Sequence, residues 1–145
     1  MITCSKLYTD IPFAHRQHLH AGHCSRIHGH NWDIKLTFAC SELDSNDFVV
    51  DFGKLKYLKR YIDDNLDHAC VFSDEDPLAK AIIESAPEGI YQPYWLKNAS
   101  CEGLAEHLYH EFSALMKEHE GGRVWISEIE MFEDRKNTVK FIPQL

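Results

Sequence analysis

The segment 28–38 alternates strictly between two kinds of side chain, and this pattern constrains the fold more than any other part of the chain. One set consists of His28, His30, Trp32, Ile34, Leu36 and Phe38. Mainly polar residues occupy the positions between them. A period of two is typical of a strand with one buried face. The chain therefore contains a sheet with a hydrophobic core on one side.

Similar patterns predict three more strands, at residues 7–15, 124–133 and 138–142. On the first strand the residues expected to share a face are Leu7, Thr9, Ile11, Phe13 and His15. On the second they are Ser127, Ile129, Met131 and Glu133. Residues 48–50 resume an extended run, and residues 90–98 are expected to form an irregular loop around Pro93.

Helices are predicted in the middle of the chain, between the two pairs of strands. The first follows Asp51, a plausible N-cap, and its apolar face consists of Leu55, Leu58, Ile62 and Leu66. A short helix could start at Asp76-Pro77 and end near Pro87. Ser100 caps a longer helix that Gly121-Gly122 ends, with Leu104, Leu108, Phe112 and Leu115 toward the core. This order predicts one α+β domain over residues 1–145, with a four-stranded antiparallel sheet and helices packed on one face.

Composition excludes several classes of function. The 145 residues carry a formal charge of -8, which argues against nucleic acid as the main partner. No run approaches 18 apolar residues, so we expect no membrane span. The N-terminus has no apolar stretch typical of a secretory signal, and the five cysteines form no C-x-x-C pair. We therefore expect a cytoplasmic protein with reduced thiols.

Histidine is the residue type that points to chemistry, because six of the 10 histidines lie between positions 15 and 30. His28 and His30 point to the same side of their strand. His15 would supply a third nitrogen if its strand pairs with theirs as a hairpin. Three neutral imidazoles that leave one position open are typical of a catalytic zinc site, although imidazole also suits other divalent ions. The others in this segment, His18, His20 and His23, are expected to be solvated loop residues.

Five further residues have both a structural and a chemical interpretation. Cys24 could be an inert buried thiol, a fourth metal ligand, or a thiolate base beside the metal. Asp67-His68 could simply close a helix end, or could act as a proton shuttle. An inward Glu133 needs a partner, and could bind the paired N–H donors of an amino-pyrimidine. Glu102 is first of all a residue that compensates the helix dipole.

Ordered motifs across nearly the whole chain carry a family resemblance. They are Ala14-His15-Arg16, Cys24-x-x-x-His28-Gly29-His30-Asn31, Phe48-Val49-Val50-Asp51-Phe52-Gly53-x-Leu55-Lys56, Leu66-Asp67-His68, Ser100-Cys101-Glu102-Gly103-Leu104-Ala105 and Glu133. Together they resemble the 6-pyruvoyl-tetrahydropterin synthase superfamily. The three-residue gap between Cys24 and His28 resembles its 6-carboxytetrahydropterin synthase branch, which belongs to queuosine biosynthesis.

The resemblance implies the tunnelling fold, ββααββ, assembled as a homohexamer of two trimers with active sites at subunit interfaces. It implies zinc on His15, His28 and His30, Cys24 as general base, Asp67 and His68 as proton-relay partners, Glu133 as the pterin anchor, and Glu102 near the pterin pocket. The implied substrate is 7,8-dihydroneopterin triphosphate, and the products are 6-carboxytetrahydropterin, acetaldehyde and triphosphate. Candidate cations for the triphosphate are Arg16, Arg26 and Lys35. The alternatives are the pyruvoyl-forming synthase, which makes no acetaldehyde, and a non-catalytic zinc-binding module.

Overall fold

The alternating segment lies at the centre of a sheet of six strands, in the order β4-β3-β1-β2-β5-β6. The structure, a computed structural model, describes residues 1–144. Its strands are β1 (Cys4–His15), β2 (His28–Cys40), β3 (Cys70–Ser73), β4 (Pro93–Leu96), β5 (Val124–Phe132) and β6 (Thr138–Phe141). Its helices are α1 (Lys56–Asn65), α2 (Ala79–Glu84) and α3 (Cys101–Glu120), with 3-10 turns η1 (His23–Ser25) and η2 (Phe52–Lys54). No helix in this part of the chain is long and apolar enough to cross a bilayer.

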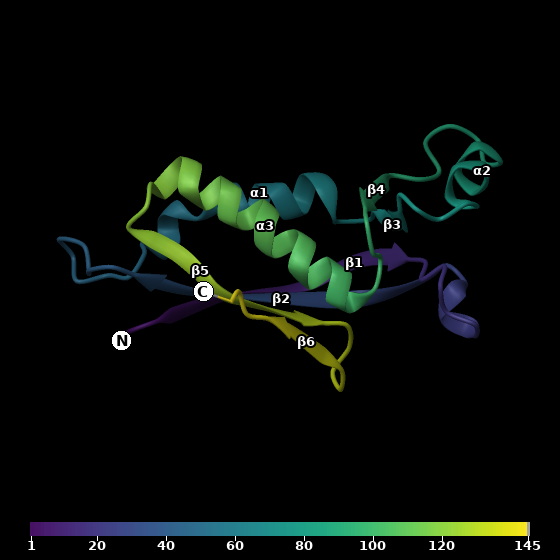
Figure 1. Cartoon of the computed structure of the whole chain (residues 1–145). Helices are drawn as coiled ribbons and strands as arrows, with labels where there is room; N and C mark the ends of the chain where they lie inside the picture. The colour runs from purple at the N-terminus through teal and green to yellow at the C-terminus, as the bar shows by residue number, and fades with distance from the viewer. Residues whose placement is uncertain (145) are drawn as a thin grey trace.

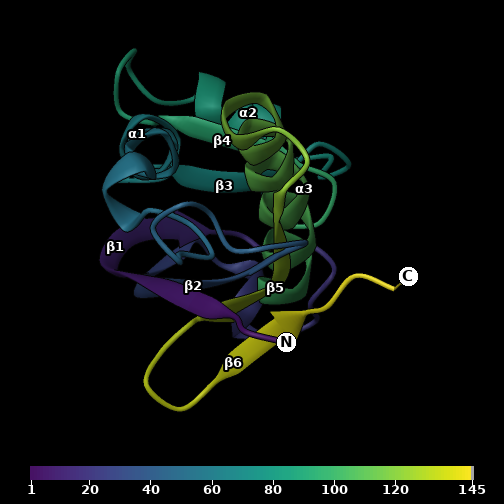
Figure 2. The same ribbon diagram turned by 90° about the vertical axis from the view of Figure 1, so that its left-hand side faces the viewer.

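The main core lies between the sheet and the helices α1 and α3. Both helices lie on the same side of β1 and β2 (Figures 1 and 2). The predicted apolar face of α1 is confirmed, because Leu55, Leu58, Ile62 and Leu66 are all buried. In α3 the predicted cap is also confirmed, because the Ser100 hydroxyl accepts a hydrogen bond from the Gly103 backbone N–H.

The predicted four-stranded antiparallel sheet is wrong, because β3 and β4 extend it on one side by parallel pairing. All four residues of β3 are buried, so the strand shows no alternation that a period of two could reveal. β4 starts at Pro93, inside the expected loop. A proline can occupy the first position of an edge strand, where its missing N–H breaks no ladder bond. The sheet is therefore mixed, and it has six strands.

The sequence predicted that all helices pack on one face of the sheet, and this prediction is wrong. Residues Cys70 and Phe72 of β3 pack against Ala79 of α2 in a second, small cluster. Val71, between them, belongs to the main core. Since neighbouring residues of a strand point to opposite faces, α2 packs against β3 on the face of the sheet opposite α1 and α3.

A bulge in β1 corrects the expected face of that strand. Between Tyr8 and Ile11 the pairing with β2 shifts register, and Asp10 adopts a φ of 56°. The Asp10 backbone N–H donates to the Asp33 carboxylate at 2.8 Å. The extra residue leaves Leu7 exposed and buries Tyr8, so Leu7 and Thr9 do not share a face with His15. The bulge therefore sets which residues at the end of β1 point toward the helices.

Candidate metal centre

Three histidines meet where the ends of β1 and β2 pair. The antiparallel register places His15 opposite His28, and Phe13 opposite His30. The ring centroid of His15 lies 4.6 Å from that of His28 and 5.4 Å from that of His30. The hairpin pairing that the sequence required for a third imidazole is thus confirmed.

Hydrogen bonds to backbone carbonyls orient two of these rings. His15 Nδ1 lies 2.8 Å from the Ala99 carbonyl oxygen, and His28 Nδ1 lies 2.7 Å from the Arg26 carbonyl oxygen. A carbonyl oxygen can only accept, so each Nδ1 carries the proton and donates it. In the neutral rings the lone pairs are therefore on the two Nε2 atoms.

These two Nε2 atoms face each other at 3.1 Å. Burial lowers the pKa of His15 to about 4, so this ring is neutral near pH 7. When the His28 ring is neutral as well, the two rings direct two lone pairs toward the same point. A cation between them would remove their repulsion, and a carbonyl on the far nitrogen is the usual support of a metal-bound imidazole.

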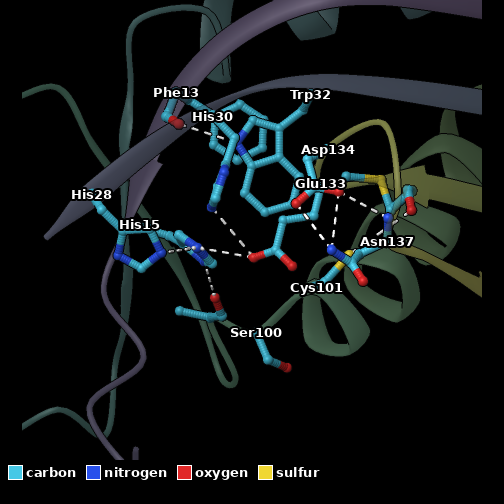
Figure 3. A network of polar contacts seen from close by, with 12 residues as sticks. Phe13, His15, His28, His30, Trp32, Ser100, Cys101, Glu133, Asp134 and Asn137 are labelled. Atoms are coloured by element: carbon cyan, nitrogen blue, oxygen red, sulfur yellow. Dashed lines mark hydrogen bonds and ion pairs between the residues drawn. The ribbon is translucent and has the colours of Figure 1, made fainter. Parts of the chain in front are cut away.

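Glu133, the residue that follows β5, completes the cluster. Its Oε1 lies 3.5 Å from His15 Nε2 and 3.4 Å from His30 Nε2, as the dashed lines in Figure 3 show. The register pairs Met131 with Ile34, so Glu133, two residues further along, reaches the end of β2 that carries His30. His30 Nε2 is buried, and the geometry gives it no hydrogen bond within residues 1–144.

The donor atoms of His15, His28, His30 and Glu133 all lie within 4.8 Å of one another. Three imidazole nitrogens and a carboxylate oxygen suit a divalent metal ion. The orphaned His30 nitrogen and the facing lone pairs of the other two rings both fit such an ion. The cluster can therefore hold a metal, and Glu133 belongs to the same group of donors.

Trp32 packs against two of the clustered histidines. Its side chain is fully buried, and its Nε1–H donates to the Phe13 carbonyl at 3.0 Å. The indole makes edge contacts with the rings of His15 and His30, at centroid distances of 5.0 and 5.1 Å. The alternation of β2 places Trp32 on the histidine face of the strand, but nothing in the sequence assigned it a role. The supporting carbonyl of Ala99 left no signal in the sequence, because any residue supplies one.

Comparison with known proteins identifies the family to which the chain belongs. The sequence profile of 6-pyruvoyl tetrahydropterin synthase matches residues 5–143. The chain belongs to the 6-pyruvoyl tetrahydropterin synthase family. It is an enzyme, as members of this family are, and the resemblance inferred from its motifs is confirmed.

Curated relatives carry the name of the carboxy-forming branch. The chain is 32% identical to the 6-carboxy-5,6,7,8-tetrahydropterin synthase of Rickettsia bellii over 92% of this chain and 94% of that one. It is 34% identical to the enzyme of the same name from Rickettsia typhi, over 77% and 80%. The Bacillus subtilis enzyme is 43% identical, over 49% of this chain and 50% of its own.

Solved structures confirm the architecture of the family. An uncharacterised protein from Wolinella succinogenes superposes with a TM-score of 0.80 at 18% identity, covering 99% of this chain and 98% of that one. The 6-pyruvoyl tetrahydropterin synthase of Caenorhabditis elegans gives 0.69 at 20% identity, covering 99% and 96%. At these identities the likeness concerns the fold alone.

The structure places Cys24 in the turn η1, four residues before β2 begins. Its side chain is partly buried, and its backbone carbonyl accepts a hydrogen bond from the Gln17 N–H at 3.1 Å. Within residues 1–144 the thiol is not one of the four clustered donors. Its role as a base in this family member stays a prediction. By contrast, burial raises the pKa of Cys70 to about 11 and, with the charge of Glu133, that of Cys101 to about 12, so these two thiols stay protonated.

The predicted pair Asp67-His68 is formed, because His68 Nδ1 contacts the Asp67 carboxylate. His68 has a φ of 64°, and its backbone N–H donates to the Pro12 carbonyl at 2.7 Å. The same residue and His30 line an open hollow of about 470 Å³. The structure thus places His68 beside the same hollow as His30, with its imidazole exposed, and the role of the pair in proton transfer stays a prediction.

Glu102 lies apart from the four clustered donors. It is exposed in the first turn of α3 and lines a groove with Lys97, Glu106 and His110. Its position fits a residue that compensates the helix dipole. A role in binding the substrate stays a prediction.

Proposed function

We propose that this enzyme converts 7,8-dihydroneopterin triphosphate and one water molecule into 6-carboxy-5,6,7,8-tetrahydropterin, acetaldehyde and triphosphate. The observation that carries the proposal is the cluster of three histidines and Glu133, in a chain whose curated relatives bear that product's name. The proposal includes zinc as the metal, held by His15, His28 and His30. When bound, zinc supplies a Lewis acid that acidifies groups of the substrate side chain.

The substrate's ring has a suitable groove beside the cluster. This groove, of about 380 Å³, is lined among others by His30, Asp33, Phe132 and Glu133. In the proposal, the Glu133 carboxylate binds the paired N–H donors of the pterin, which match its two oxygens. The side chain of the substrate then extends toward the histidines, since Glu133 lies within 3.5 Å of two of them.

Protons are moved by residues on either side of the cluster. The Cys24 thiolate takes a proton from the substrate side chain. His68, which Asp67 orients, moves protons through the hollow that it shares with His30. Internal redox reduces the ring and oxidises the side chain, so the reaction needs no nicotinamide.

We also propose that the active form is a homohexamer in the cytoplasm. Leu7 and Trp125 are 52% and 44% exposed on the face of the sheet opposite α1 and α3, and β4 and β6 are open edges. Exposed apolar side chains and open edges favour association. A stable single chain in sedimentation at micromolar concentration contradicts this part.

Product analysis tests the reaction. Purified protein is incubated with 7,8-dihydroneopterin triphosphate, and the products are identified by mass together with an acetaldehyde assay. Carboxytetrahydropterin with acetaldehyde supports the proposal. A pyruvoyl product without acetaldehyde supports the alternative activity, that of a 6-pyruvoyl tetrahydropterin synthase. The structurally similar protein from Caenorhabditis elegans carries this name.

Metal analysis tests the cofactor. We expect one zinc per chain, and each change of His15, His28 or His30 to alanine should lower metal content and activity together. Full zinc retention in His15→Ala contradicts its assignment as a ligand.

A further inference from the structure

Arg16 directly follows the first histidine, but its side chain is engaged elsewhere. Its Nε–H donates to Asp76 Oδ2 at 2.8 Å, and Nη2 approaches Oδ1 at 3.5 Å. Nη1 donates to the Ser25 carbonyl oxygen. The guanidinium thus joins the connection between β3 and α2 to the turn η1, which carries Cys24.

Asp76 is a fixed anchor for this contact. Its side chain is fully buried, and Oδ1 also accepts a hydrogen bond from the Leu78 backbone N–H at 3.0 Å. Burial by itself would raise the pKa of Asp76, but the hydrogen bond and charge of Arg16 hold it below its usual range. The carboxylate is therefore charged, and a buried charge of this kind requires its partner.

Gln17 and Arg16, two neighbouring residues, bind the backbone of the turn that carries Cys24. The Gln17 N–H donates to the Cys24 carbonyl, and Arg16 donates to the next carbonyl, that of Ser25. The carbonyl that follows, of Arg26, orients the His28 ring. One short segment thus carries the proposed base, the Arg16 contact and the support of a histidine.

We propose that Arg16 and Asp76 are positioning residues that hold the Cys24-bearing turn beside the metal centre. This inference rests on the proposed role of Cys24 as the base. It also replaces the expectation that Arg16 binds the triphosphate, because three of the five guanidinium N–H groups are directed at Asp76 and Ser25. Lysine cannot replace arginine here, because an ammonium does not reproduce the planar fork that reaches both partners.

Kinetics and hydrogen exchange together test the proposal. The variants are Arg16→Lys, Arg16→Gln and Asp76→Asn. The matched control is Lys59→Gln, which removes a cation from an exposed pair with Asp63 on α1. For each we measure kcat, KM and zinc content, and hydrogen exchange of the peptide that spans residues 20–27.

In the three variants kcat should fall by about 10- to 100-fold, the loss expected when a catalytic group is misplaced by about 1 Å. KM should stay within about threefold and zinc content unchanged, because neither side chain belongs to the clustered donors. Exchange of the 20–27 peptide should be about tenfold faster, since the turn loses its anchor. The control should behave like the original protein.

Three results overturn the proposal. An increase in KM with unchanged kcat and exchange shows that Arg16 binds substrate. Faster exchange with unchanged kcat shows that the turn need not be held for catalysis. Unchanged exchange of the 20–27 peptide shows that the contact of Arg16 with Asp76 and Ser25 does not hold the turn in place. Arg16→Lys decides if the other variants do not fold, because it keeps a positive charge for Asp76. Exchange needs no turnover, so failure of the base assignment itself is recognised separately, by full activity of Cys24→Ala.

Discussion

Replacing Trp32 by phenylalanine should loosen the metal centre without removing any of its donors. The indole N–H would be lost, and with it the 3.0 Å hydrogen bond to the Phe13 carbonyl, which contributes about 1 kcal/mol. The smaller ring would also leave a gap beside His15 and His30, both of which now contact the indole. Partial loss of a large buried ring costs about a further 1–2 kcal/mol.

We therefore expect Trp32→Phe to lower the free energy of unfolding by about 2–3 kcal/mol in total. Metal affinity should fall by about tenfold, the lower range for loss of a group that supports metal ligands. Urea unfolding of the metal-free protein measures the first effect, and competition with a chelator of known zinc affinity measures the second.

The chain offers a matched control for this experiment. Trp125 is 44% exposed, and its strand neighbours Val124 and Ile126 are buried, so its side chain points to the opposite side of the sheet from the core. Trp125→Phe should cost less than about 0.5 kcal/mol, as surface changes usually do. Equal stability and metal affinity in the two variants would refute the idea that Trp32 holds the histidines in place.

Three further predictions concern individual site residues. Burial lowers the pKa of His15 to about 4, against about 6.5 when unfolded, so between these pH values the unfolded state binds more protons. The metal-free protein should therefore lose about 3 kcal/mol of stability as pH falls from 7 to 4, and urea titrations of His15→Gln should lack this part of the pH dependence. Cys24→Ala should keep its zinc but lose at least ~10²-fold in turnover, and Cys24→Ser should be similarly poor; steady-state rates close to the original would transfer the role of base to His68. Glu133→Gln should keep zinc and weaken substrate binding by about 2–5 kcal/mol, and metal loss measured in this variant would instead make Glu133 a ligand.

Patterns within single elements were enough to predict much of the molecule. The face of α1, the Ser100 cap of α3 and the alternation of β2 each depend on residues close together in the sequence. The pair His28 and His30 belongs to the same class, because the geometry of a strand places residues two apart on one side. These features are encoded locally, so the sequence alone determined them.

Contacts between distant segments decided the rest. Whether Leu7 or Tyr8 faces the core depends on a bulge that Asp33 of the neighbouring strand stabilises. The strand β3 is buried on both faces and so shows no alternation, and β4 begins with a proline. Only their pairing partners show that these two segments are strands.

The metal centre shows the same division most clearly. Sequence predicted three histidines, but the tertiary structure brought Glu133 to within 3.5 Å of two of them and supplied the Ala99 carbonyl that orients His15. Glu133 is 103 positions from His30 along the chain, and a backbone carbonyl is common to every residue. Local periodicity reports only which way a side chain points, whereas distances between segments depend on sheet register and packing.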